Sequence, residues 1–327
     1  MSHGDHFLTH SIELDYVKGH MGGNEIVFLD GTQISPRHYV DVGLSVLETP
    51  SVHGDQTGVL LKPKGSGDLR VKIVDRTTRG FITMCGGMSQ VLPKALAETY
   101  LGKRFGIRKP MKKIDLETDL GIVRISVRSA ARGETVAFTD MTKFMNECYR
   151  RGLSRIQVSG VNAFKIGEFL VVDASEILKS HPAADFLTMN QPAKEILIDM
   201  QKDFDNQHLS PTANADYSLF DMYPEDPMRG RVLFPHSIPT GHIEPSCGTG
   251  TIAVAIALSY SGRVTGPSAS IRFDSGDGPY LGGPETTTVE MLLENGKVKQ
   301  AEFSHSRVEI TSIGKIWVHK SSSDKAK

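Results

Sequence analysis

Two of the three cysteines, Cys85 and Cys247, stand in nearly the same local sequence. Cys85 opens the stretch CGGMSQVLPKALAETYLG, and Cys247 opens the stretch CGTGTIAVAIALSYSG. In both stretches a glycine turn follows the cysteine, then an apolar run with helical spacing, then a glycine of the kind that ends helices. The two cysteines are about one domain length apart, which suggests two similar domains that each present a thiol at the start of a helix.

A thiol at the N-terminus of a helix is suited to moving protons. The unpaired N–H groups and the positive end of the helix dipole stabilise a thiolate, and they lower a thiol pKa from its free value of about 8.5. The same N–H groups can hold a carboxylate, and glycines let a ligand approach the backbone. If the two domains face each other across a cleft, one thiolate can remove the α-proton of a bound acid while the opposite thiol protonates the other face. Such a pair would invert an α-carbon, would titrate as one coupled system, and would need neither a metal nor an organic cofactor.

The pattern along the chain predicts the elements that position these thiols. Pro93 indicates that the helix after Cys85 begins near Ser89 and runs to Leu101, because proline is tolerated in a first turn. The polar stretch 204–231 is expected to be a long irregular segment that contains one strand. We expect strands at 12–17, 25–29, 58–61, 69–74, 81–85, 121–127, 168–172 and within 271–318, and helices within 175–206 and at 252–260.

Length and composition exclude several classes of protein. A chain of 327 residues suggests two domains, and 39% hydrophobic with 23% charged residues permits a packed core. Lys plus Arg is 37 and Asp plus Glu is 38, so a net charge of -1 provides no basic field for nucleic acid or an anionic membrane. The N-terminus lacks an apolar stretch for a signal peptide, and the run 252–258 is too short to span a membrane. We therefore expect a cytoplasmic protein with reduced thiols and a small-molecule partner.

These cysteine motifs carry a resemblance to a known family. Met84-Cys85-Gly86 is similar to the first catalytic motif, and Cys247-Gly-Thr-Gly-Thr251 to the second motif, of the cofactor-independent amino-acid racemases and epimerases. That superfamily includes diaminopimelate epimerase, proline racemase and 4-hydroxyproline epimerase, and the resemblance covers roughly residues 12–318. It implies Cys85 and Cys247 as the acid and base, an amino or imino acid as substrate, no cofactor, and a possible homodimer.

The resemblance also implies a fold. It is an α+β fold with two similar diaminopimelate-epimerase-like domains, each a β-barrel-like sheet around a central helix, with the active site in the cleft between them. One lobe would comprise residues 1–118 and 309–327 and carry Cys85. The other would comprise residues 119–308 and carry Cys247.

Further residues are implied as substrate contacts. Asn24 lies in a Gly-Gly-Asn-Glu segment, and Gln56 follows Asp55, both like segments of the diaminopimelate epimerase branch. Asn162 is a candidate for another asparagine of that branch. Glu244 precedes the second cysteine much as an acidic residue does in proline racemases, although the spacing is one residue shorter. The implied backbone contacts at the two helix starts are Gly86, Gly87, Gly248, Thr249 and Gly250.

Other interpretations of these residues stay open. A free cysteine is most often a small buried hydrophobe, which is how we interpret Cys148. Asn24, Gln56 and Asn162 could serve turns or caps, and Glu244 could lie in a solvated loop. No histidines have the spacing of a metal site.

Two departures from the family pattern leave the substrate open. Gly87 and Met88 stand where the family carries His or Asn, and His242-Ile243 offers no arginine for a distal carboxylate. Retaining both cysteines favours a racemase or epimerase. The alternatives are a double-bond isomerase or a hydroxyproline-type dehydratase on the same fold and, in a different class, a non-catalytic amino-acid binding protein.

Overall fold

The computed structural model describes residues 11–48, 51–107, 109–129, 135–207, 216–237, 242–275 and 285–319. The contacts of the chain group into two compact units. Unit 1 comprises Met1–His20, Glu25–Arg124 and Glu309–Lys327, and unit 2 comprises Met21–Asn24 and Ile125–Val308. Each unit contains both helices and several strands, so the predicted α+β class is confirmed.

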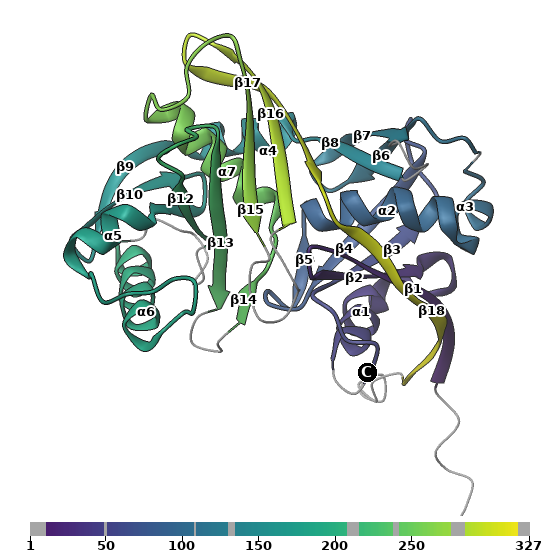
Figure 1. The fold of residues 1–327 in the computed structure, drawn as a ribbon. Coiled ribbons are helices and arrows are strands. Elements are labelled where there is room, and N and C mark those ends of the chain that lie inside the picture. Colours follow the sequence, from purple (N-terminus) through teal and green to yellow (C-terminus); the bar gives the residue numbers. More distant parts are fainter. Residues whose placement is uncertain are drawn as a thin grey trace, which may run out of the picture. The chain divides into compact units, whose positions relative to one another are not determined.

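Unit 1 is built on strands that come from both ends of the chain. β18, near the C-terminus, pairs with β1, and Figure 1 shows the yellow ribbon of β18 alongside the purple ribbon of β1. β2 pairs in parallel with β3, β3 is antiparallel to β4, and β4 pairs with both β5 and β6. The strands of this unit are β1 (Ser11–Met21), β2 (Asn24–Asp30), β3 (Gln56–Leu61), β4 (Leu69–Asp75), β5 (Gly80–Ile82), β6 (Lys113–Thr118), the start of β7 (Gly121–Ser129) and β18 (Val308–His319).

The helices of unit 1 cover these strands. α1 (Tyr39–Leu47), preceded by the short 3-10 helices η1 (Gly31–Gln33) and η2 (Pro36–His38), packs against β3 and β4. α1 was missed in the sequence, although its apolar residues join Val59 and Val74 in one buried cluster. α2 (Gly86–Glu98) is followed by the short α3 (Tyr100–Arg104).

α2 begins earlier than the sequence indicated. The helix starts at Gly86, directly after Cys85, so Pro93 lies inside it and not in its first turn. The prediction of a start near Ser89 was therefore wrong, because the cysteine cap and not the proline sets this end. Burial offsets the hydrogen bond that proline omits: Met88 packs against Gly58 of β3, and Val91 against Gly19 of β1. A Cβ at Gly19 would lie only 2.6 Å from Val91, so this close approach requires glycine.

Unit 2 has a longer run of strands. β9, β10 and β11 form antiparallel neighbours, β11 pairs in parallel with β12, and β12 continues through β13, β15, β16 and β17 to β8. The strands are β8 (Thr135–Asp140), β9 (Leu153–Val158), β10 (Val161–Ile166), β11 (Phe169–Asp173), β12 (Asp216–Met222), β13 (Arg229–Ser237), β14 (His242–Glu244), β15 (Ser268–Ser275), β16 (Glu285–Glu294) and β17 (Lys297–His305). The helices are α4 (Thr142–Arg151), α5 (Ala174–Ser180), α6 (Gln191–Asn206) and α7 (Gly248–Tyr260).

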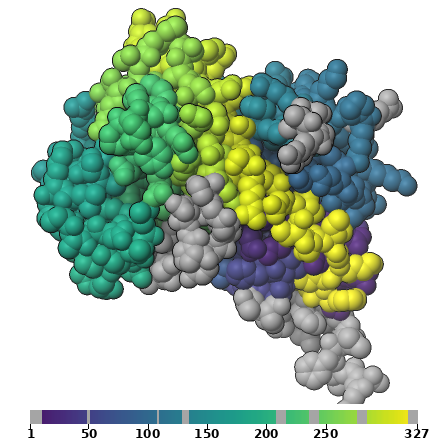
Figure 2. Space-filling view, viewed as in Figure 1, coloured from purple at the N-terminus to yellow at the C-terminus, as the bar shows by residue number. Residues whose placement is uncertain are grey.

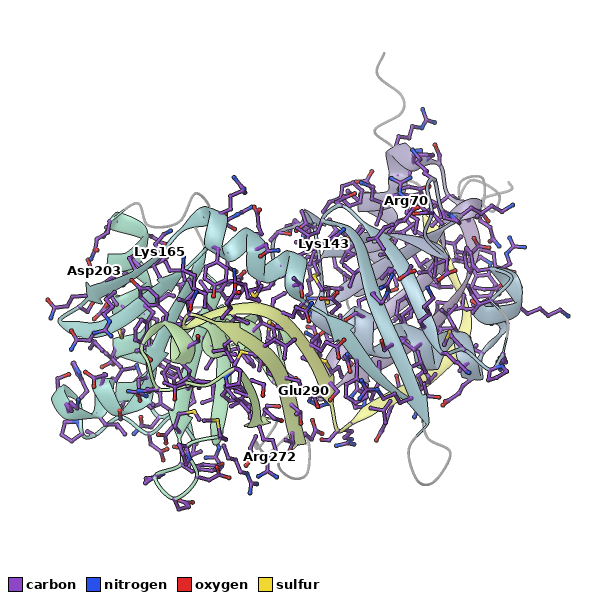
Figure 3. The ribbon with its side chains drawn as sticks, turned by 90° about the horizontal axis from the view of Figure 1, so that it is seen from above. Arg70, Lys143, Lys165, Asp203, Arg272 and Glu290 are labelled. Carbon is purple, nitrogen blue, oxygen red and sulfur yellow. The ribbon has the colours of Figure 1, made fainter. Side chains whose placement is uncertain are left out.

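α7 is the most deeply buried helix of unit 2. Every residue from Gly250 to Ser259 is buried, and the helix contacts α4 and strands β10, β11, β12, β16 and β17. A helix that is apolar on every face needs such surroundings. β16 shows how the strands serve this core, since Thr287, Val289 and Met291 are buried while Glu290 between them is exposed. Figure 3 shows Glu290 and Arg272 among the charged side chains that project outward.

A second core of unit 2 lies under α5 and α6. Leu170, Val172 and Leu219 of the strands pack there with Leu197 and Phe204 of α6. In the space-filling view the teal surface of this region continues into the green surface of later strands (Figure 2). None of the helices in the described part of the chain is long and apolar enough to cross a membrane.

Candidate active site

Cys85 is the N-cap residue of α2. Its backbone is extended, with φ -135° and ψ 121°, and its Sγ accepts a hydrogen bond from the N–H of Met88 at 3.3 Å. A cap side chain normally offers an oxygen as the hydrogen-bond acceptor at this position. Here the sulfur is the acceptor, and it lies at the positive end of the helix dipole, where negative charge is favoured. Cys85 is 8% exposed, and Gly86 and Gly87 are also buried.

Gln56 and Asp75 lie beside the Cys85 thiol. The Sγ of Cys85 donates to Oε1 of Gln56 at 3.7 Å, and Nε2 of Gln56 donates to Oδ2 of Asp75 at 3.0 Å. Asp75 also accepts from the N–H of Thr78 at 2.7 Å. Gln56 and Asp75 are register partners on antiparallel strands β3 and β4, so the sheet holds both next to α2. Three buried polar groups therefore form one chain that ends at the thiol.

Cys247 is the N-cap residue of α7, in the same conformation as Cys85. Its φ is -130° and its ψ is 114°, and its Sγ accepts from the N–H of Gly250 at 3.4 Å. The hydroxyl of Thr249 lies 3.3 Å from the same sulfur and can donate to it or accept from it. Cys247 is 8% exposed, like Cys85. Each unit thus carries one thiol that caps the N-terminus of a buried helix.

Gly250 has a packing reason to be glycine. A Cβ at this position would lie 2.6 Å from the ring of buried Phe234 and 2.9 Å from Oγ of Ser218. These are closer than real Cβ contacts, so the first turn of α7 can approach β12 and β13 only without a side chain here.

Asn24 and Glu244 lie next to Cys247 in unit 2. The amide of Asn24 donates to the carboxylate of Glu244 and, at 3.2 Å, to the backbone carbonyl of Ser246. Asn24 is 1% exposed and Glu244 is 8% exposed. The neighbouring Gly22 adopts φ +54°, and a Cβ there would lie 2.6 Å from Glu285 and 2.7 Å from His305. The Gly22-Gly23-Asn24 turn is therefore held against the core of unit 2.

Several buried polar atoms around Cys247 lack a hydrogen-bond partner within the described residues. They are Oδ1 of Asn24, Oγ of Ser246 and Oγ of Ser218, the last of which lies beside Gly250. Buried polar atoms are nearly always paired with protein, water or ligand. Their open hydrogen-bonding capacity beside the thiol suits a polar ligand.

The structure thus brings most of the predicted site residues into two groups. Gln56, Gly86 and Gly87 gather with Cys85 in unit 1. Asn24, Glu244, Gly248, Thr249 and Gly250 gather with Cys247 in unit 2.

Asn162 does not join either group. It lies exposed on β10, and its amide donates to Glu176 of α5 at 3.2 Å. The third cysteine, Cys148, lies in α4, where burial raises its thiol pKa to about 12. A thiol with such a pKa stays protonated and inert near neutral pH, as the sequence suggested for this cysteine.

Sequence reasoning missed Asp75 and Ser218. Both are buried residues of strands, but only the pairing of β3 with β4 and the approach of β12 to α7 place them at the thiols. Among the described residues, no group of three or more His, Cys, Asp and Glu side chains could hold a metal ion.

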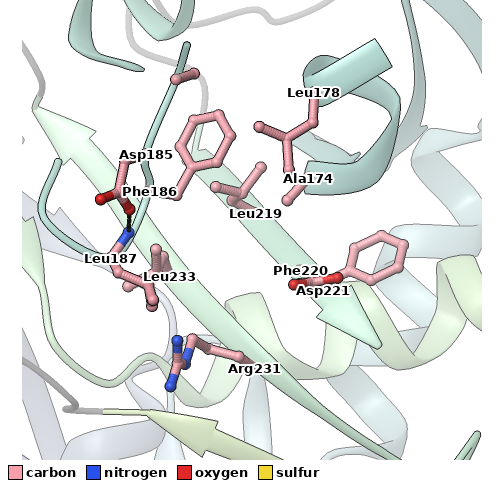
Figure 4. A pocket seen from close by; sticks show the side chains of 11 residues that line it. Ala174, Leu178, Asp185, Phe186, Leu187, Leu219, Phe220, Asp221, Arg231 and Leu233 are labelled. Atoms are coloured by element: carbon pink, nitrogen blue, oxygen red, sulfur yellow. Dashed lines mark hydrogen bonds between the residues drawn. The ribbon is translucent and has the colours of Figure 1, made fainter. Parts of the chain in front are cut away.

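A cavity of about 230 Å³ in unit 2 is separate from both groups. Leu219, Phe186 and Leu233 form apolar walls, and Asp221 and Arg231 from paired strands lie at one side (Figure 4). Burial and the nearby Asp173 raise the pKa of the Asp221 carboxyl. None of the predicted site residues lines this cavity.

Solved structures from the PhzF and proline racemase superfamily have a fold similar to that of this chain. This confirms at the level of fold the resemblance found in the sequence, although no family model and no curated protein matches the sequence itself.

Three of these structures cover nearly the whole chain. A hydroxyproline epimerase from Agrobacterium vitis with bound trans-4-OH-L-proline has a TM-score of 0.64 and 16% identity over 95% of this chain and 93% of that one. A PhzF family phenazine biosynthesis protein from Bacillus anthracis has a TM-score of 0.60 and 11% identity over 95% and 100%. A methylitaconate-delta-isomerase has a TM-score of 0.59 and 13% identity over 95% and 97%.

Proposed function

We propose that the protein is a cofactor-independent amino-acid racemase or epimerase that uses Cys85 and Cys247 as its acid and base. The observation that carries this proposal is the matched geometry of the two thiols. Each is an N-cap residue with extended backbone, and each sulfur accepts the N–H of the third residue after it, at 3.3 and 3.4 Å. One activated thiol per unit is what a two-base inversion needs, and a binding protein would need neither.

The proposed reaction moves one proton on each side of the α-carbon. One thiolate takes the α-proton and becomes a thiol, and the electron pair of the broken C–H bond delocalises into the substrate carboxylate. The opposite thiol then gives its proton to the other face of the carbon and becomes a thiolate. The mechanism requires both sulfurs to reach the same carbon from opposite sides.

The residues beside the thiols have binding roles in this proposal. The N–H groups at the starts of α2 and α7 would hold the substrate carboxylate, which the positive ends of the helix dipoles favour. Glu244, held by Asn24, would accept hydrogen bonds from the substrate nitrogen. The open acceptor of Asn24 and the hydroxyl of Ser246 would complete the polar lining beside Cys247.

Deuterium incorporation tests the proposal. Each enantiomer of a broad panel of amino and imino acids is incubated with the protein in D₂O, and α-deuterium and configuration are followed by NMR and chiral chromatography. Cys85→Ser and Cys247→Ser should each lower inversion by at least about 100-fold. Cys148→Ser is the matched control and should retain wild-type activity. Absence of α-exchange across the panel, or a Cys85→Ser or Cys247→Ser variant with normal turnover, would overturn the two-base proposal.

A second candidate is a double-bond isomerase, favoured by the methylitaconate-delta-isomerase among the similar structures. The same thiols would remove a proton at one carbon and return it at another, so the mass of the substrate would not change. NMR of unsaturated dicarboxylic acids incubated with the protein distinguishes this activity, because a vinyl proton appears or disappears. A dehydratase would instead change the mass by the loss of water.

A further inference from the structure

The two thiols differ in one polar side chain that lies within hydrogen-bond distance of each. Cys85 faces the Oε1 of Gln56, and a carbonyl oxygen can only accept a hydrogen bond. That contact is favourable only while Cys85 carries its proton. Cys247 faces the hydroxyl of Thr249, which can turn its proton toward a thiolate. Of these two contacts, the one with Thr249 therefore tolerates a thiolate, and the one with Gln56 does not. The Glu244 carboxylate, which also lies near Cys247, accepts a hydrogen bond from the amide of Asn24.

Asp75 fixes which end of the Gln56 amide faces Cys85. A carboxylate only accepts hydrogen bonds, so it selects the NH₂ end of the amide, and Nε2 of Gln56 lies 3.0 Å from Oδ2. Turning the amide over would set two oxygens against each other and would point N–H donors at the sulfur. The other carboxylate oxygen of Asp75 is tied to the N–H of Thr78, which holds the acceptor in place. All three side chains of the Cys85–Gln56–Asp75 chain are less than 9% exposed, so water does not weaken the preference.

We propose that Asp75, acting through Gln56, holds Cys85 as the protonated thiol, so that Cys247 is the thiolate of the resting protein. This inference rests on the proposed function and assigns the first step of it. Cys247 removes the α-proton in the first turnover, and Cys85 donates its proton to the opposite face. The resting protein is then prepared for the substrate configuration whose α-proton points toward Cys247. Gln56 and Asp75 are positioning residues in this inference, because neither gives or takes the transferred proton.

Alkylation by iodoacetamide, measured thiol by thiol, tests the inference without any turnover. The reagent reacts with thiolates, and Cys85 and Cys247 have the same 8% exposure. Peptides of the whole protein are quantified by mass spectrometry after brief labelling at several pH values between 6 and 9. In the wild-type protein Cys247 should be modified first, and its rate should rise at a lower pH than that of Cys85.

Two variants should allow the Cys85 thiol to ionise more easily. Asp75→Asn frees the Gln56 amide to turn, and Gln56→Met removes the acceptor, so each should raise the alkylation rate of Cys85 at pH 7 by about 3- to 10-fold and leave Cys247 unchanged. Thr57→Val is the matched control. Thr57 follows Gln56 on β3, and its hydroxyl donates a buried hydrogen bond to the carbonyl of Gly43 in α1. The variant removes that bond without touching the Cys85 chain, and it should leave the Cys85 rate unchanged.

Urea unfolding followed by far-UV circular dichroism reports whether a variant is still folded, because Gln56 and Asp75 lie in unit 1 whereas Cys148 lies in unit 2. Faster or equal labelling of Cys85 in the wild-type protein would overturn the inference, as would unchanged Cys85 rates in folded variants. If Asp75→Asn does not fold, Gln56→Met and the wild-type order still decide. The expected order in a protein that inverts no amino acid would refute the proposed function alone, and the reverse order in an active protein would refute this inference alone.

Discussion

Gly250→Ala tests whether packing explains the glycine in the second cysteine motif. The added Cβ would lie 2.6 Å from buried Phe234 and 2.9 Å from Ser218, whereas ordinary contact begins at 3.4 Å. The Phe234 ring must therefore retreat by about 0.8 Å within a filled core. Overpacking of this kind costs about 1–3 kcal/mol, and the better helix propensity of alanine returns up to about 1 kcal/mol. We expect unit 2 to lose about 1–2 kcal/mol of its free energy of unfolding.

Labelling of Cys148 measures this loss within unit 2. Cys148 is 2% exposed on α4, which packs against α7, so a thiol reagent reaches it only when this region opens. Cys85→Ser and Cys247→Ser in the background leave Cys148 as the single thiol. A loss of about 1–2 kcal/mol should accelerate its labelling about 5- to 30-fold.

The matched control for Gly250→Ala is its combination with Phe234→Leu, which removes the ring atoms that the Cβ would meet. The double variant should be more stable than the two single effects added together. Labelling of Cys148 in Gly250→Ala at the wild-type rate, or more slowly, would refute the packing argument.

Three further changes have defined outcomes. Burial raises the pKa of the Asp30 carboxyl, but hydrogen bonds from Thr32 and Arg104 outweigh it and hold the pKa below its usual range, so this carboxylate stabilises the fold above pH about 4 and less as the pH falls through its folded pKa. Asp30→Asn should therefore cost about 2 kcal/mol in urea unfolding at pH 7 and less at pH 3, and an equal cost at both would contradict this. Asn24→Leu should lower kcat/KM for inversion at least about tenfold, because Glu244 loses the amide that positions it; unchanged kcat/KM would exclude that role. Gly22→Ala should lower the thermal midpoint by several degrees, since it combines a positive φ with close contacts, and an unchanged midpoint would show that the turn can relax.

Much of the local structure could be predicted from the sequence. Strands such as β4 and β16 follow from alternation, and α7 follows from its apolar run between two glycines. The helix start after Cys85 was misplaced, because Pro93 favoured a first-turn position and only burial of α2 on both sides lets an internal proline persist. α1 was missed, since its amphipathic pattern is short and its stability comes from packing on β3 and β4.

The candidate site divides in the same way. The cysteine and glycine motifs of Cys85 and Cys247 were visible in the chain because a capped helix start is a local feature, set by a few consecutive residues. Asn162 was proposed from sequence alone, and its place on the surface beside Glu176 could be seen only in the fold.

By itself the sequence determined that each of the two thiols lies at the start of a helix, because a cysteine followed by glycines and an apolar run is a local pattern of consecutive residues. Only the tertiary structure decided what surrounds each thiol. Gln56 and Asp75 reach Cys85 through the pairing of two strands, and Asn24 reaches Glu244 across more than 200 residues. Such contacts depend on strand register and on the packing of distant segments, which no local pattern specifies.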